Sequence, residues 1–135
     1  MHIPVLICGF VIGTRPAIMI GLLAPILSHL MTSMPPAYAV PLMTMELPFY
    51  GLAASLAYRH FKLNIYLSLL IAMIIGRLVF ALGLFIMGQF IALPYGPAQF
   101  FAVGGAVISG IPGIIFQFII IPPLVLSLKR MRHYK

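Results

Sequence analysis

Five long apolar runs, separated by short breaks, constrain this chain more than any other feature. The runs cover residues 3–13, 17–31, 40–58, 64–93 and 100–128. Only 7% of the residues are charged, against roughly 25% in an ordinary soluble domain. A helix needs about 20 apolar residues to cross a bilayer. The sequence therefore predicts an all-α membrane protein, a compact bundle of about five transmembrane helices that forms a single integral membrane domain over residues 1–135.

The cations lie at the ends of these runs and predict the orientation of the bundle. Arg15, residues 59–62 and the tail from Lys129 are basic, whereas connections 32–40 and 94–99 carry no Lys or Arg. Short basic connections stay on the cytoplasmic side, so we expect an exterior amino terminus and a cytoplasmic carboxyl terminus. Cations in these places meet anionic lipid headgroups of the bilayer, which makes nucleic acid an improbable partner despite the net charge of +7.

Three local patterns bear on the connections between the runs. The first run is shorter than the roughly 17 residues that a crossing needs. Ala37-Tyr38-Ala39 resembles a cleavage site, but more apolar sequence follows it and no basic region opens the chain, so we predict a loop there. Asn64 is predicted to begin the helix of the fourth run.

Small residues spaced four apart predict seams where helices approach closely. Membrane helices associate through such small residues, because lipid tails offer no hydrophobic driving force between helices. The spacing occurs at Gly9/Gly13, Ala17/Gly21, Ala102/Ala106/Gly110 and Ser109/Gly113.

Proline interrupts the last run at two places, Pro112-Gly113 and Pro122-Pro123. A broken membrane helix exposes backbone groups that need a protein or water partner. The pattern fits either a kink that lines a cavity or a simple bend.

Two ionisable residues lie inside the predicted membrane segments. Glu46 is the only acidic residue of the chain, and Arg77 lies near the middle of the fourth run. Because a charge at full depth costs about 2.5 to 3.5 kcal/mol, both must face the bundle interior or water. They either pair or snorkel and hold two helices together, or one or both contact a polar ligand.

Two polar residues share helix faces with possible pocket positions. Tyr50 follows Glu46 by four residues, with Ala53 and Ala57 further along the same face, and Gln117 shares a face with Ser109 and Gly113. The candidate ligand-binding residues are therefore Glu46, Tyr50, Arg77 and Gln117. For Tyr50 the alternative is an interfacial aromatic, and for Gln117 an interhelical hydrogen bond.

The chain lacks the residues that catalysis would need. One carboxylate cannot supply an acid pair or a magnesium site, and no Gly-rich loop ends in Gly-Lys-Ser or Gly-Lys-Thr. Cys8 is the only cysteine, and the four histidines are spread over both sides of the predicted membrane. We therefore expect no enzyme activity, no catalytic residue, no cofactor and no metal site.

Several segments resemble the substrate-binding S components of energy-coupling factor (ECF) vitamin transporters. The opening residues 1–5, Gly9-Phe10, and residues 25–28 with 34–36 are similar to that family's second and third helices. Residues 43–47 with 50–52 are similar to the start of its fourth helix. Gly76-Arg77 falls in the fifth, and residues 110–113 with Gln117 and Ile121-Pro122 resemble the sixth.

The resemblance implies the function of a capture subunit in a prokaryotic cell membrane. Members of the family have six helices, bind a water-soluble vitamin or related micronutrient from outside, and work with a membrane T component and two cytoplasmic ATPases. Members also carry a helix before the stretch that matches residues 1–5, and that helix docks on the T component. Met1 therefore looks like an internal methionine of a chain that lacks its first helix.

The alternative function is a non-transporting membrane scaffold in which Glu46 and Arg77 only pair. The ligand stays open at this stage. Arg77 would suit a carboxylate such as niacin or pantothenate, and a riboflavin-like ring could instead stack on Tyr50.

Overall fold

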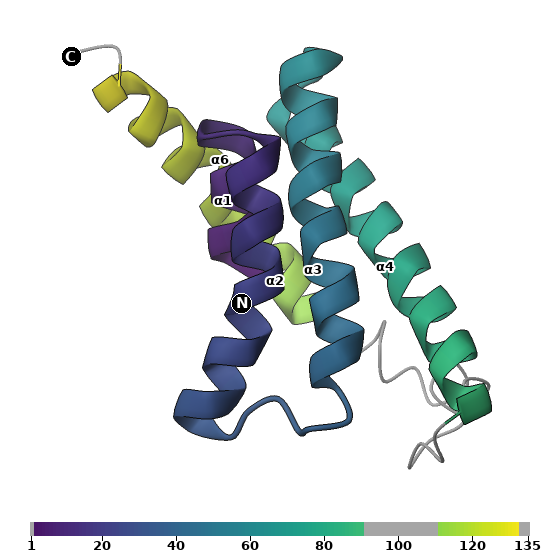
Figure 1. The fold of residues 1–135 in the computed structure, drawn as a ribbon. Coiled ribbons are helices and arrows are strands. Elements are labelled where there is room, and N and C mark those ends of the chain that lie inside the picture. Colours follow the sequence, from purple (N-terminus) through teal and green to yellow (C-terminus); the bar gives the residue numbers. More distant parts are fainter. Residues whose placement is uncertain (1, 91–110, 133–135) are drawn as a thin grey trace.

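The computed structural model describes residues 2–90 and 111–132, and this part of the chain contains helices and no strand (Figure 1). The predicted all-α bundle is thereby confirmed. The helices in chain order are α1 (His2–Val11), α2 (Thr14–Thr32), α3 (Val40–Ser55), the π-helical turn η1 (Leu56–His60), α4 (Ile65–Phe90) and α6 (Ile111–Arg132).

Three of these helices, α2, α4 and α6, are long and apolar enough to cross a membrane. α1 has 10 residues and therefore a length of about 15 Å, half of a hydrocarbon core, as its short run predicted. α3 has 16 residues, but η1 continues it without a break to His60. The first part of the fifth run, residues 100–110, and the neutral connection 94–99 lie outside the described residues.

Helix α3 organises the bundle, because it packs against α1, α2 and α4. Its contacts with α1 and α2 depend on side chains that are very small. A Cβ on Gly9 would lie 2.7 Å from the Gly51 carbonyl oxygen, and one on Gly21 would lie 2.6 Å from the backbone nitrogen of Pro48. Such distances leave no room for any side chain, so the backbones of α1 and α2 rest directly on α3. Gly9 and Gly21 thus belong to helix contacts, as their spacing predicted.

Two other glycines of the predicted seams have different environments. Gly13 separates α1 from α2 with φ of +142°, a conformation that L side chains rarely adopt. It lies between the helices and turns the chain, and a Cβ there would lie 2.8 Å from Arg59 Nη1 of η1, so a close approach occurs here too. Among the described residues, a Cβ on Gly113 would meet no atom within 4 Å, and Ser109, its partner in the predicted seam, lies outside the described residues.

The prolines of the last run do not break its helix. α6 continues through Pro122 and Pro123 to Arg132, so these prolines lie inside one helix, and the choice between a kink and a simple bend stays a prediction. Pro112 lies in the first described turn of α6, where the helix needs no backbone N–H from it.

The connections also follow the predicted pattern. Residues 33–39 form the expected loop, in which Ser28 Oγ donates a hydrogen bond to the Met34 carbonyl (2.8 Å) and His29 Nδ1 donates one to the Pro35 carbonyl (2.7 Å). Asn64 precedes α4, and its carbonyl accepts the Ser68 N–H at 2.9 Å. This confirms Asn64 as the residue at which the helix begins.

The basic connections meet at one end of the bundle, opposite the 33–39 loop (Figure 1). Lys129 Nζ donates to the Tyr58 hydroxyl at 2.8 Å and lies 4.0 Å from the centre of its ring. Arg59 donates to the Ile12 carbonyl and so ties η1 to the end of α1. We call this region the basic end; its cations are Arg15, Arg59, Lys62, Lys129 and Arg130.

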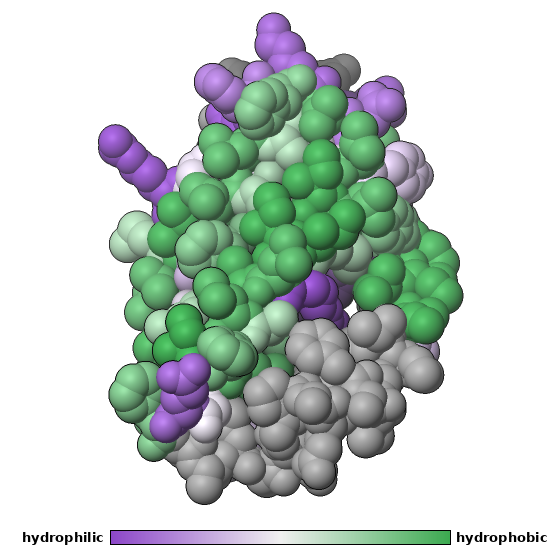
Figure 2. Space-filling view, turned by 90° about the vertical axis from the view of Figure 1, so that its right-hand side faces the viewer, coloured by the Kyte–Doolittle hydropathy of each residue, from purple (hydrophilic) through white to green (hydrophobic). Residues whose placement is uncertain are grey.

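The surface between the two ends is apolar. Figure 2 shows hydrophobic residues over the middle of one face, with polar residues gathered at its upper end. On α2, Leu30 and Met31 are 74% and 83% exposed. Side chains of this kind are costly in water and stable against lipid tails, so this distribution fits a bundle that spans a bilayer.

Candidate ligand pocket

A cavity of about 200 Å³ lies where α1, α3, α4 and α6 meet. α1 and α6 both run toward the basic end, and the cavity touches the opposite part of each, at His2 and Gly113. It therefore lies at the ends of α1 and α6 that are remote from the basic end, and beside the middle of α3 and α4, where Tyr50 and Arg77 lie. Its described lining consists of His2, Tyr50, Met73, Arg77, Gly113, Ile114 and Gln117.

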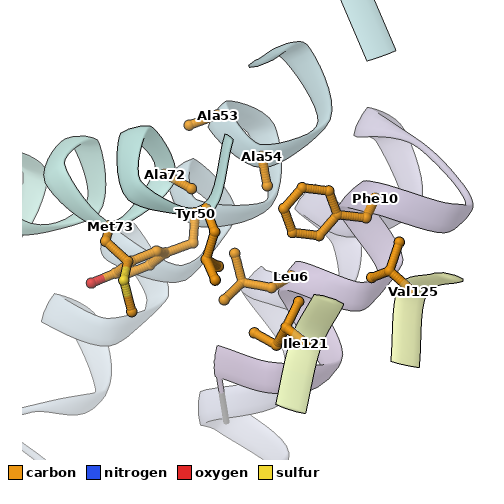
Figure 3. Close-up of a cluster of buried hydrophobic side chains, with 10 residues drawn as sticks. Leu6, Phe10, Tyr50, Ala53, Ala54, Ala72, Met73, Ile121 and Val125 are labelled. Atoms are coloured by element: carbon orange, nitrogen blue, oxygen red, sulfur yellow. The ribbon is translucent and has the colours of Figure 1, made fainter. Parts of the chain in front are cut away.

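Tyr50 forms the inner wall of this cavity. The residue is only 3% exposed, and its ring belongs to the main hydrophobic cluster with Leu6 and Phe10. Its hydroxyl is directed away from Phe10, and the ring lies beside Met73 (Figure 3). The His2 ring meets it edge-on, with centroids 4.9 Å apart. Tyr50 thus joins the apolar core to a polar cavity.

Gly76 makes room for the Tyr50 ring. A Cβ at position 76 would lie 2.3 Å from Tyr50 Cζ, well inside van der Waals contact. Because helix α4 has no side chain here, the ring can lie flat on its backbone. The Gly76-Arg77 pair therefore has two linked roles: the glycine admits the aromatic wall, and the next residue supplies a charge to the cavity.

Arg77 and Gln117 supply the polar groups of the cavity from α4 and α6. Gln117 Oε1 is buried and has no hydrogen-bond partner among the described residues. A buried polar atom without a partner costs about 1 to 3 kcal/mol. A ligand with an N–H or O–H group would satisfy this acceptor, and the Arg77 guanidinium would bind an anionic or acceptor group of the same molecule.

Glu46 lies one turn before Tyr50 on α3, outside the described lining of the cavity. It is 3% exposed and interacts with Tyr50, and Arg77 is near enough to act on both groups through its charge. Among the described residues, no hydrogen bond reaches Glu46 Oε1 and no ion pair joins this carboxylate to Arg77. The face formed by Glu46, Tyr50, Ala53 and Ala57 is buried, and of these four residues only Tyr50 is in the described lining of the cavity.

The structure brings three of the four predicted residues to the cavity: Tyr50, Arg77 and Gln117. Glu46 lies one turn before Tyr50 on α3 and is not in the described lining. Sequence reasoning missed His2, Met73 and Ile114. Met73 lies four residues before Arg77 and Ile114 three before Gln117, so helical spacing carried a usable signal for both. His2 carried none, because only packing of α1 against α3 brings it to Tyr50.

No group of three or more His, Cys, Asp or Glu side chains could hold a metal ion within residues 2–90 and 111–132. The cavity instead offers one cation, one amide and two aromatic rings, which is chemistry for holding a small polar molecule.

The model of a family described as "ECF transporter, substrate-specific component" matches residues 1–125. No curated protein and no solved structure matches the chain.

Proposed function

The chain belongs to the family of substrate-specific components of ECF transporters, and on this premise we propose that it captures a water-soluble vitamin or related micronutrient from outside the cell. Members of this family are transporter subunits that act within an ECF transporter, and not enzymes. The membrane bundle and the family together make the chain a multi-pass membrane transport protein.

The observation that carries the proposal is the cavity shared by Arg77 and Gln117. These polar residues come from different helices and converge on about 200 Å³ of space, and Gln117 Oε1 has no partner in the described chain. A scaffold gains nothing from an unpaired buried amide, whereas a binding site needs one for recognition. Tyr50 and His2 offer ring surfaces against which a flat ligand can pack.

Energy for uptake comes, in this proposal, from partners. The described chain presents one buried carboxylate, Glu46, and a proton relay through the membrane would need more. A membrane T component and two cytoplasmic ATPases would therefore drive release of the captured molecule into the cell. The basic end would face these ATPases, and the cavity would open toward the exterior.

This orientation predicts which connection is reached from outside. In cells, Ala37→Cys in the 33–39 loop is expected to react with a membrane-impermeant maleimide, because the residue is exposed at the end remote from the cations. Phe61→Cys, 68% exposed at the basic end, is expected to react only after permeabilisation, and it leaves every charge in place. Native Cys8 is buried and gives little background. Labelling of Phe61→Cys in intact cells, with Ala37→Cys protected, would reverse the orientation.

Capture predicts ligand-dependent stability of the purified protein. A thermal-shift screen in detergent against water-soluble vitamins and related bases is expected to give a shift with one compound or a few related ones. Ligand at a hundredfold excess over its dissociation constant stabilises the folded state by about 2.7 kcal/mol. Glu46→Ala is expected to reduce the ligand-dependent shift strongly. Its effect on the unfolding temperature of the ligand-free protein is expected to be smaller.

The same screen separates capture from the alternative of a scaffold. If the folded protein shows no shift with any compound, and Glu46→Ala lowers only the unfolding temperature, the polar groups hold helices together and the capture proposal fails. A shift that survives in Glu46→Ala but is lost in Gln117→Leu would keep the proposal and remove Glu46 from the site.

A further inference from the structure

A second cavity, of about 440 Å³, lies at the basic end between the end of α1, the start of α2 and the end of α3. Arg15, Arg59 and His60 line it with positive or ionisable groups, and Thr14 and Ser55 line it with hydroxyls. Thr14 Oγ1 donates to Ser55 Oγ at 2.8 Å, and Ser55 is only 2% exposed. A defined polar contact therefore joins α2 to α3 beside the cavity, whereas Arg15, Arg59 and His60 are exposed on its outer side.

The charge of this cavity is not balanced by the protein. The whole chain holds eight Lys and Arg and one acidic residue, Glu46. Glu46 lies nine residues before Ser55, about 14 Å away along α3, so it cannot neutralise Arg15 or Arg59. Arg59 also uses one N–H group on the Ile12 carbonyl, which holds its guanidinium at the cavity while its other donors stay available. The described lining of the cavity contains no acidic side chain, so an anion from outside the chain could bind to these arginines.

The remaining lining selects the kind of anion. Ile12 and Leu56, 56% and 40% exposed, bring apolar side chains to the same cavity as the two arginines. The cavity thus has a cationic part and an apolar part, at the height where a membrane helix meets lipid headgroups. Arg binds phosphate through paired N–H groups, and basic pockets between membrane helices suit phospholipid headgroups.

We infer that this cavity is a binding site for the phosphate headgroup of an anionic phospholipid, with acyl chains resting on Ile12 and Leu56. The site is separate from the ligand pocket and does not depend on vitamin capture. A bound lipid would neutralise the cations and join the starts and ends of three helices, so it would stabilise the bundle.

The test compares phosphatidylglycerol with phosphatidylcholine added to the delipidated protein in detergent. Native mass spectrometry is expected to show one retained phosphatidylglycerol, with a matching rise in unfolding temperature that phosphatidylcholine does not give. Arg15→Gln is expected to weaken phosphatidylglycerol binding about tenfold, because it removes a charged donor. Arg130→Gln removes an equal charge at the same end but outside the cavity, and is expected to change binding by less than about twofold.

Each other outcome contradicts a defined part of the inference. Equal retention of the two lipids, or equal loss in Arg15→Gln and Arg130→Gln, would show that no specific site exists. Equal stabilisation by inorganic phosphate or glycerol 3-phosphate would replace the lipid by a soluble anion. Arg15→Gln is expected to unfold at the wild-type temperature without lipid and to keep its vitamin-dependent shift. A failure of the lipid-site inference can therefore be told apart from a failure of the vitamin-capture proposal.

Discussion

Gly76→Ala is expected to lower the stability of the bundle by about 1 to 3 kcal/mol and to abolish ligand binding in the same step. The added Cβ would lie 2.3, 2.4 and 2.6 Å from Tyr50 Cζ, Cε2 and Cε1, so the ring must move. The ring is 3% exposed and packs against His2 and the core cluster, so it can move only against these neighbours or into the ligand cavity that it lines. Thermal unfolding in detergent measures the loss of stability, and titration with the vitamin found in the screen measures the loss of affinity.

Gly113→Ala is the matched control, since it makes the same change in the wall contributed by α6. A Cβ there meets no atom of the described residues within 4 Å, so we expect unchanged or slightly higher stability, because alanine favours a helix by about 1 kcal/mol over glycine. Tyr50→Ala in the Gly76→Ala background should restore part of the stability and none of the binding. Equal destabilisation by the two alanine substitutions would show that glycine is needed at position 76 for some reason other than the Tyr50 ring.

Arg77→Gln is expected to weaken vitamin binding by about ten- to a hundredfold, the value of one hydrogen bond to a charged group. Without ligand, we expect the same variant to be as stable as the wild type or more stable, because it removes a charge from the membrane interior. Arg77→Lys keeps the charge but loses the paired N–H geometry, so its affinity should lie between the two. Isothermal titration and thermal unfolding give the two quantities separately.

The thermal unfolding of Arg77→Gln without ligand decides whether Arg77 contacts the ligand or only pairs with Glu46. If Arg77 and Glu46 existed only to pair, Arg77→Gln would leave a buried carboxylate without its partner and cost about 3 to 5 kcal/mol. Arg130→Gln, which removes an exposed charge from α6, should change neither quantity. A large loss of stability with unchanged affinity would therefore support the scaffold interpretation.

The sequence by itself determined the class of fold and the position of the basic connections and the 33–39 loop at opposite ends of the bundle. Apolar runs, their breaks and the placement of cations depend on the transfer of each segment between water and lipid, which is a local property of the chain. For the same reason the 33–39 loop, the short first helix and the start at Asn64 were predictable. That Glu46, Tyr50, Ala53 and Ala57 share one helix face followed from helical spacing alone.

Only the tertiary structure decided how the helices meet. Glycine spacing could not tell Gly21, which lies against the backbone of Pro48, from Gly13, which turns the chain, or from Gly113, which borders open space. The continuity of α6 through Pro122 and Pro123 was likewise beyond the pattern. The site itself needed the fold most, because His2, Tyr50, Arg77 and Gln117 come from four helices, and the distances between helices depend on side-chain packing that no single segment encodes.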